Sequence, residues 1–494
     1  MLLLGIDLGT SAIKVSVVDA ETQKVLVSAR SPEDTESSIL SVLPGWAEQS
    51  PEQWWVDVEK AIAHVNASGT YDARDIGAIG ISYQMHGLVL VDKENKPLRN
   101  AIIWCDSRAV DIGNEAFEAL GREKTLSSLL NSPGNFTASK LAWVKQQEPA
   151  IYGKIAKFML PGDYIASKLT NYISTSISAL SEGIFWDFSK NQLSEEILNH
   201  FGFDRSLFPD IKPVFSEHGR LVPSVARSLG LKAGIPVSYK AGDQPNNALS
   251  LNVLKPGEVA ATAGTSGVIY GVTDQLIYDQ QSRVNTFAHV NYSVEQPSLG
   301  VLLCINGTGI LNRWVKEHFG HGLSYDQMNG LAKSVERGSN GLRILPFGNG
   351  AERIFENRLP GAHIRNLDFN LHGRSHVFRA SQEGVAFAFR YGLDIMRQNG
   401  MDPSVIRAGS ANMFLSELFT EIFVDATGVP VQLYQNDGSV GAAIGAGIGV
   451  GAYNSAAEAF EGAIPIKTIE PGPTTPYEPL YQEWLGLLNE QLSN

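Results

Sequence analysis

The spacing of apolar and polar residues predicts an α/β protein. Two apolar runs fill the first eighteen residues, and we expect them to pair as a β-hairpin that turns at Gly9. Residues 51–66 instead place apolar side chains three and four positions apart, which predicts a helix with one buried face. Ser50 is suited to cap that helix. Strand and helix patterns then alternate through the first half.

The same patterns predict further elements along the chain. A strand at 76–82 leads into a polar turn, and the stretch from 170 to about 225 favours loops. The Gly- and Ala-rich segment 439–453 predicts a helix that packs closely against a backbone or a ligand. Other helices are expected around 108–120, 137–147, 161–169, 308–319 and 380–399, and other hairpins around 258–273 and 284–305.

The tripeptide Gly-Thr-Ser occurs twice, at 9–11 and at 264–266, each time at a turn between two apolar runs. Similar hairpins half a chain apart suggest two related domains that face each other, although a chance repeat of a common turn is the alternative. A chain of 494 residues also exceeds what one core usually holds. We expect an N-terminal domain over 1–246 and a C-terminal domain over 247–494.

Composition narrows the class of protein. The net charge of −13 argues against nucleic acid or an anionic membrane as the main partner. The two cysteines fit neither a disulfide framework nor a zinc site. The first residues lack the basic segment of a signal peptide, and no apolar run is long enough to span a membrane, so we expect a cytoplasmic protein. Because the net charge repels anions, the binding of an anionic ligand would need hydrogen-bond donors and a metal ion at the site itself.

The first Gly-Thr-Ser turn has the chemistry of a phosphate site. Thr10 and Ser11 add hydroxyl donors to backbone N–H groups, a combination that suits a phosphate chain. Asp7, in the preceding strand, could hold Mg²⁺ or its waters, because magnesium prefers one or two carboxylates with phosphate oxygens. A plain β-turn is the alternative. No Gly-x₄-Gly-Lys-Ser/Thr motif occurs, which excludes a P-loop.

Asp243 is the leading candidate for a general base. It follows a predicted strand and opens a polar run, so its carboxylate can point into a cleft. There it could accept the proton of a substrate hydroxyl that attacks a γ-phosphate. The alternative is an N-cap aspartate that satisfies the first N–H groups of a helix.

The turn after the 76–82 strand contains Met85 and His86, a pair that could bind a polyol. The imidazole would bond to hydroxyls while the thioether packs against the carbon face. A structural or solvated histidine is the alternative. Asp106 offers another polar strand end, and it can equally cap the helix that follows.

Together these motifs resemble the FGGY family of carbohydrate kinases over roughly residues 2–452. The resemblance implies a duplicated actin-like (ribonuclease H-like) ATPase fold with a cleft between its domains, and ATP and Mg²⁺ as cofactors. It gives Asp243 the role of general base and Asp7 that of catalytic and metal residue. It implies nucleotide contacts at Thr10, Ser11, Lys14, Gly264, Thr265, Ser266, Gly309, Gly409 and Asn412, and sugar contacts at Met85, His86, Asp106, Asp243 and Gln244. Ala408 stands where the family usually has the first glycine of a Gly-Gly pair.

The Met85-His86 pair also bears on the substrate. Members of the family that phosphorylate glycerol carry an Arg-Glu pair there, and this chain is similar to members that phosphorylate xylulose. The resemblance implies transfer of the γ-phosphate of ATP to the 5-hydroxyl of a ketopentose, D-xylulose first. Ribulose, rhamnulose, fuculose or gluconate kinases of the family, and an actin-like ATPase switch, are the alternatives. A homodimer is compatible with the resemblance.

Overall fold

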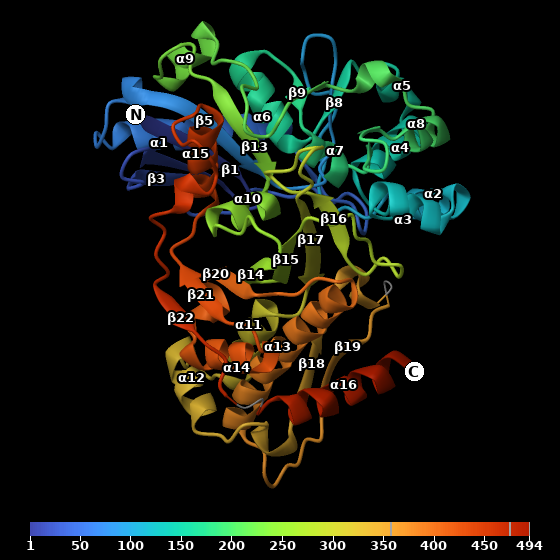
Figure 1. Cartoon of the computed structure of the whole chain (residues 1–494), viewed down its shortest axis with the longest axis vertical. Coiled ribbons are helices and arrows are strands. Elements are labelled where there is room, and N and C mark those ends of the chain that lie inside the picture. The colour runs from blue at the N-terminus through green and yellow to red at the C-terminus, as the bar shows by residue number, and fades with distance from the viewer. Residues whose placement is uncertain (356–357, 474–475, 494) are drawn as a thin grey trace.

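Two mixed β-sheets, one in each half of the molecule, form the centre of the computed structural model (Figure 1). The structure describes residues 1–355, 358–473 and 476–493. The N-terminal half and its sheet lie at the top of Figure 1, and the second sheet with the long helices lies below.

The first sheet has the strand order β13-β5-β1-β2-β3. Its first three strands in sequence are antiparallel neighbours, and its last two run parallel to β1 and to each other. The apolar runs explain this placement, since Leu3, Leu4 and Ile6 are fully buried. The strand bounds are β1 Leu2–Leu8, β2 Ile13–Asp19, β3 Val25–Ser31, β5 Ile76–Tyr83 and β13 Val237–Gly242.

The second sheet repeats that topology. Its order is β16-β17-β15-β14-β20-β21-β22, and the five strands from β17 to β21 have the same directions as β3 to β13. The repeat confirms the expected duplicated fold. The bounds are β14 Glu258–Ala263, β15 Gly267–Thr273, β16 Asn285–Ala288, β17 Leu299–Ile305, β20 Val405–Gly409, β21 Val431–Tyr434 and β22 Lys467–Ile469.

Helix α15 (Gly438–Gly449) belongs to the second half of the sequence but packs on the first sheet (Figure 1). The approach is close enough that a Cβ added at Gly5 would lie 1.8 Å from the carbonyl oxygen of Ser439. This confirms the prediction that the Gly- and Ala-rich helix packs against a backbone. The same helix contacts α10 (Asp243–Ser250), which also contacts strands of both sheets, so α10 links the two halves.

The remaining helices cover the two sheets or form an extension of the first half. Helix α1 covers the first sheet, and α2–α5 with α8 lie to the right in Figure 1. The helix bounds are α1 Pro51–Ala67, α2 Val110–Leu120, α3 Arg122–Leu129, α4 Thr137–Gln147, α5 Pro149–Tyr152, α6 Pro161–Thr170, α7 Ile177–Glu182, α8 Glu195–Phe201, α9 Pro223–Leu229, α11 Gly309–Phe319, α12 Tyr325–Lys333, α13 Arg374–Gln398, α14 Glu417–Thr427 and α16 Glu478–Ser493. Short two-stranded sheets pair β4 Glu48–Gln49 with β7 Ala101–Ile102, β6 Val89–Val91 with β8 Lys157–Met159, β9 Ser174–Thr175 with β12 Asp210–Ile211, β10 Trp186–Asp187 with β11 Gln192–Leu193, and β18 Arg343–Phe347 with β19 Gly361–Arg365.

Most predicted helices are confirmed, and the misses have local causes. The Ser50 hydroxyl accepts a hydrogen bond from the N–H of Gln53 at 3.3 Å, so Ser50 caps α1 as expected. The stretch up to 225 is rich in loops as predicted, but it also contains α7 and α8, two helices capped by Ser176 and Ser194 that are too short to show a period. Helix α13 starts six residues before the predicted 380, in a polar first turn.

The two halves also meet along β16. Its Ala288 accepts a hydrogen bond from the Ser178 hydroxyl of α7 at 2.8 Å and donates one to the Ser181 hydroxyl at 2.9 Å. Beside them, Asn131 exchanges two hydrogen bonds with the backbone of Thr286, at 2.6 and 2.8 Å. An edge strand of the second sheet is thereby fixed to the first half.

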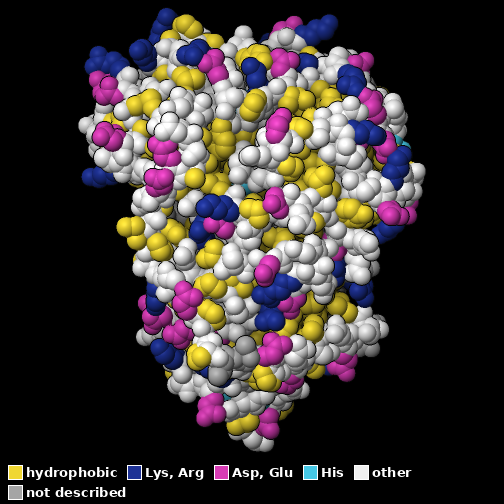
Figure 2. All heavy atoms as spheres, viewed as in Figure 1, with side chains coloured by type: hydrophobic (Ala, Val, Ile, Leu, Met, Phe, Trp, Pro, Cys, Tyr) yellow, Lys and Arg dark blue, Asp and Glu magenta, His cyan; other side chains and the backbone are white. Residues whose placement is uncertain are grey.

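Charged side chains of both signs are interspersed over the face shown in Figure 2. The negative net charge is therefore not gathered into one patch on that face. Within the described ranges, none of the helices has the length and apolar character needed to cross a bilayer.

Candidate active site

The first Gly-Thr-Ser turn lies between β1 and β2, and side chains of the first half hold it through hydrogen bonds. The Thr10 hydroxyl accepts a hydrogen bond from Nε1 of Trp104 at 2.9 Å and donates one to Oε1 of Gln84 at 3.4 Å. The Thr10 carbonyl accepts one from Nε2 of Gln49 at 2.8 Å. These contacts fix the turn while the neighbouring Ser11 stays exposed.

Asp7 lies opposite Lys14 in the β1–β2 ladder and beside the start of α15. A Cβ added at Gly438 would lie 2.5 Å from Oδ2 of Asp7, so only a glycine leaves room for the carboxylate. Burial raises the pKa of Asp7; the charge of Asp437 adds to this rise, while Lys14 opposes it. Lys14 Nζ lies 3.5 Å from Oδ2 of Asp437. A cation beside Asp7 would therefore be stabilised.

The donors around Asp7 fit a magnesium ion only if phosphate oxygens share it. The described part of the chain contains no group of three or more His, Cys, Asp or Glu side chains placed to hold a metal. Magnesium bound to phosphates commonly takes only one or two carboxylates from the protein. One half-buried carboxylate, in the strand that leads into a phosphate-type turn, meets that requirement.

Asp243 is the first residue of α10, directly after β13. Gly242 holds the N-cap position of this helix, yet the Asp243 carboxylate still accepts from backbone N–H groups of the first turn, those of Gln244 and of Asp243 itself, so the capping alternative stays open beside the role of base. Burial raises the pKa of Asp243 to about 7, and the nearby charge of Asp7 contributes to the rise. A carboxylate with that pKa can accept a proton near neutral pH. Gln244 follows it on the same first turn.

The second Gly-Thr-Ser turn lies between β14 and β15 and is held by the start of α11. The carbonyl of Gly264 accepts hydrogen bonds from the N–H of Gly309 at 2.8 Å and from the Thr308 hydroxyl at 2.9 Å. The approach is so close that a Cβ at Gly309 would lie 2.3 Å from the Gly264 oxygen. Gly309 thus supports the turn through its backbone.

A cavity of about 370 Å³ opens beside this second turn. Four of the residues predicted to contact the nucleotide line this cavity: Gly264, Thr265, Gly309 and Asn412. Ser266 and Gly409 were also predicted to contact the nucleotide, but they do not line it. The rest of the cavity wall includes polar residues that were not predicted from the sequence: Arg313, Tyr325, Asp326, Asn329 and Gln382. The capping box that starts α12 at Ser324 is a signal that could have located part of that wall.

The amide of Asn329 is oriented by a chain of hydrogen bonds. Ser416 accepts from the N–H of Phe419 at 3.1 Å and donates to Oε1 of Gln382 at 3.3 Å. Nε2 of Gln382 then donates to Oδ1 of Asn329 at 2.9 Å. Because its oxygen is used in this way, Asn329 offers its NH₂ group to the cavity as a donor.

The Met85-His86 turn lies against the strand end that carries Asp243. Met85 is 5% exposed, and a Cβ at Gly242 would lie 2.6 Å from its Cγ. His86 has φ of 60° and packs between the rings of Phe136 and Phe287, at centroid distances of 4.7 and 5.3 Å. Burial lowers the pKa of His86 to about 3, so its imidazole is neutral. The structure therefore brings three of the predicted sugar residues, Met85, His86 and Asp243, to one place.

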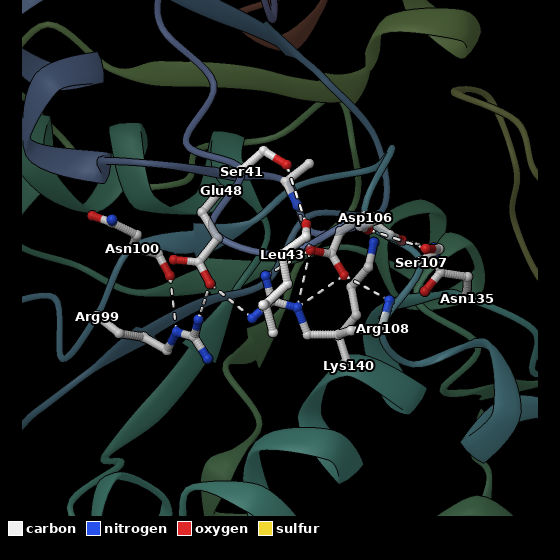
Figure 3. A network of polar contacts seen from close by, with 12 residues as sticks. Ser41, Leu43, Glu48, Arg99, Asn100, Asp106, Ser107, Arg108, Asn135 and Lys140 are labelled. Carbon is white, nitrogen blue, oxygen red and sulfur yellow. Dashed lines mark hydrogen bonds and ion pairs between the residues drawn. The ribbon is translucent and has the colours of Figure 1, made fainter.

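Asp106 takes part in a buried network of charges (Figure 3). It has no exposed surface, and its carboxylate accepts hydrogen bonds from Nε of Arg108 at 2.9 Å and from the N–H of Ala47 at 2.6 Å. Arg108 also lies 2.7 Å from Glu48, which pairs in turn with Arg99. Both oxygens of Asp106 thus serve the protein's own framework, and contact with a sugar stays a prediction.

Comparisons with known proteins agree with this architecture. Residues 2–250 match the N-terminal domain of the FGGY family of carbohydrate kinases, and residues 259–450 match its C-terminal domain. The chain is 29% identical to a xylulose kinase of Bacillus subtilis, over 93% of this chain and 90% of the relative. It is also 29% identical to a xylulose kinase of Escherichia coli, over 90% of this chain and 88% of the relative.

The chain is also similar in structure to a solved protein. The crystal structure of the xylulose kinase from Rhodospirillum rubrum superposes with a TM-score of 0.89 and 25% identity, and the match covers 100% of both chains.

Proposed function

Because this chain belongs to the FGGY family of carbohydrate kinases, we propose that it transfers the γ-phosphate of ATP to the 5-hydroxyl of D-xylulose. The observation that carries the proposal is the place of Asp243. Its half-buried carboxylate, with a pKa of about 7, stands beside Asp7 of the first phosphate turn and beside the Met85-His86 turn. A base between a phosphate turn and a polyol-type surface suits phosphoryl transfer to a hydroxyl.

The nucleotide is assigned to the cavity beside the second turn. Its volume of about 370 Å³ lies in the range of ligand sites, and the NH₂ group of Asn329 can donate to a ring nitrogen of the base. Thr265 lines the same cavity on the side of the second turn, where backbone N–H groups can meet the phosphates. The phosphate chain would then extend from there toward Thr10 and Ser11.

The chemistry of transfer follows from the charges around the first turn. Asp243 accepts the proton of the attacking hydroxyl, while Lys14 and the turn's N–H groups stabilise negative charge on the phosphoryl oxygens. Asp7 would hold Mg²⁺, which when bound neutralises part of that charge. The contacts between β16 and α7 join the two halves beside His86, against which Phe287 of β16 packs, and closing of the halves over the bound substrates would exclude water and limit wasteful hydrolysis.

The assignment of a ketopentose rests on the neutral wall of the sugar site. Met85 gives an apolar surface for C–H groups, and the neutral His86 gives one hydrogen-bonding nitrogen toward the substrate. Glycerol has fewer hydroxyls than a ketopentose, so it would leave more of the polar groups of this site unpaired. The names of the relatives in Bacillus subtilis and Escherichia coli support xylulose within the family.

The test is a comparison of kcat/KM for D-xylulose, D-ribulose, L-ribulose and glycerol with the same enzyme. We expect D-xylulose to be the best acceptor and glycerol the poorest, because a site built around hydroxyls rejects analogues that leave its polar groups unpaired. Glycerol equal to or better than D-xylulose would contradict the substrate while leaving the kinase assignment intact. ATP hydrolysis that needs no sugar and yields no sugar phosphate would instead support an actin-like ATPase switch.

A further inference from the structure

His86 is held by a residue that the sequence analysis did not single out. Glu182 is the last residue of α7 and is 2% exposed. Its Oε2 accepts a hydrogen bond from the backbone N–H of His86 at 3.0 Å, and its Oε1 accepts one from the Tyr83 hydroxyl at 2.8 Å. The carboxylate therefore connects the end of β5 to the turn that follows it.

The backbone of Glu182 holds the imidazole as well. Its carbonyl oxygen lies 3.1 Å from Nδ1 of His86. A carbonyl oxygen can only accept, so Nδ1 must carry the hydrogen. Because burial keeps the imidazole of His86 neutral near pH 7, the other nitrogen, Nε2, has a bare lone pair. The position of Glu182 thus sets the tautomer of the ring.

The turn needs this support because its backbone is unfavourable. With φ of 60°, His86 adopts the left-handed conformation that residues with side chains rarely occupy. The bond from its N–H to Glu182 offsets part of that cost, and Lys140 holds the His86 carbonyl at 2.9 Å. The rings of Phe136 and Phe287 then restrict the rotation of the imidazole. Loss of the Glu182 carboxylate would leave the N–H of His86 without this hydrogen bond, so the turn would be held less firmly.

We propose that Glu182 is a positioning residue of the sugar site, which presents Nε2 of His86 as a hydrogen-bond acceptor. The sugar group that meets His86 is therefore a hydroxyl that donates, and not a carbonyl oxygen. This inference rests on the proposed function, since it takes His86 as the wall of the acceptor site. Glu182, which does not itself contact the sugar, thereby determines how His86 recognises the sugar.

A double-mutant cycle between Glu182 and His86 tests the coupling. We expect Glu182→Ala to lower kcat/KM for the sugar about tenfold, near the upper end of what one hydrogen bond contributes, and to leave the KM for ATP unchanged. In a His86→Ala background the same change should add less than about twofold, because its effect acts through His86. A loss of equal size in both backgrounds would overturn the proposal.

Two further variants separate positioning from general stability. Glu182→Gln keeps an oxygen for the His86 N–H and an NH₂ group for Tyr83, so it should retain most of kcat/KM. The matched control is Asp57→Ala: Asp57 is also 2% exposed, and it accepts hydrogen bonds from Ser31 and Gln53 of the first half. It should lower Tm without changing kcat/KM for the sugar. A matching loss in Asp57→Ala would show that the Glu182 effect is only destabilisation.

The tautomer can be read in the wild-type enzyme, which needs no destabilising change. NMR of protein labelled with ¹⁵N-histidine, with His86 assigned from the spectrum of His86→Gln, should show a neutral ring with its hydrogen on Nδ1 from pH 6 to 8. A hydrogen on Nε2, or a charged ring, would overturn the proposal. This readout does not depend on which sugar is phosphorylated. A wild type that phosphorylates no ketose would overturn the proposed function alone.

Discussion

The two Gly-Thr-Ser turns occupy the same place in two sheets of the same topology, yet only the first is flanked by charged residues. Asp7, in the strand before the first turn, corresponds in position to Thr262 before the second. Lys14, after the first turn, corresponds to Ile269, which is 1% exposed. The backbone of the hairpin was kept in both halves, whereas the charges are found in one half only.

The two turns are also held in place by different kinds of group. Side chains of Gln49, Gln84 and Trp104 hold the first turn. The second is held by the first turn of α11, through Thr308 and the backbone of Gly309. We infer a division of work: the first hairpin carries charged side chains that act on the transferred phosphoryl group, and the second hairpin, with no charges at the corresponding positions, supports the nucleotide.

The largest effect is expected at Asp243, which lies beside the charged turn. Asp243→Ala should reduce kcat by roughly 10²–10⁴-fold, the usual contribution of a general base. ATP binding, measured by calorimetry, should change little, because the nucleotide cavity is lined by the second half. A variant that retained more than about a tenth of the wild-type rate would remove Asp243 from the role of base.

The next effect separates the two turns directly. Asp7→Asn should lower the maximal rate on the order of tenfold to a hundredfold and raise the magnesium concentration needed for half of it, since an amide is a poorer partner for Mg²⁺ than a carboxylate. The matched control is Thr262→Val at the corresponding position of the second hairpin, and it should leave the magnesium dependence unchanged. Equal responses of the two variants would contradict the division of work.

Gly309→Ala should affect the uncharged turn alone. The new Cβ would collide with the Gly264 carbonyl at 2.3 Å, and overpacking of this kind costs about 1–3 kcal/mol. We therefore expect the KM for ATP to rise roughly ten- to thirtyfold, while the KM for the sugar stays the same. A change confined to the KM for the sugar would contradict the assignment of the second turn to the nucleotide.

The pH profile gives the smallest effect. Asp243 must be deprotonated to act as base, and its pKa is raised to about 7. The rate should therefore fall as the pH drops below 7, by about tenfold between pH 8 and pH 6. Because Asp7 contributes to the raised pKa, Asp7→Asn should move this limb to lower pH. A rate that is flat from pH 8 to pH 6 would argue against a base with this pKa.

Local patterns predicted the parts of the molecule that depend on short stretches of sequence. The apolar runs around Gly9 and Gly264 predicted both hairpins, and the repeated tripeptide predicted the duplication. The packing of α15 on the first sheet joins residues more than 400 positions apart, and the sequence contains no signal of which backbone it meets. Glu182 was missed for the same reason, since its partner His86 is brought to it by the fold.

Asp106 shows the opposite limit. It was predicted at a polar strand end, but β7 ends at Ile102, and the Asp106 carboxylate is bound by Arg108, only two residues further on. A pattern of residue types could not tell whether that carboxylate meets a ligand or its own neighbour. The distinction depends on side-chain geometry, which places Asp106 in a buried network with Glu48 and Arg99.

The most direct test of the divided turns is calorimetric titration of ATP, with and without Mg²⁺, into Asp7→Asn, Gly309→Ala and the wild type. We predict that Asp7→Asn binds metal-free ATP like the wild type but loses the gain in affinity that Mg²⁺ provides. Gly309→Ala should weaken ATP binding by the same factor in both conditions. An Asp7→Asn protein that keeps the full magnesium effect, or a Gly309→Ala protein that loses it, would contradict the account.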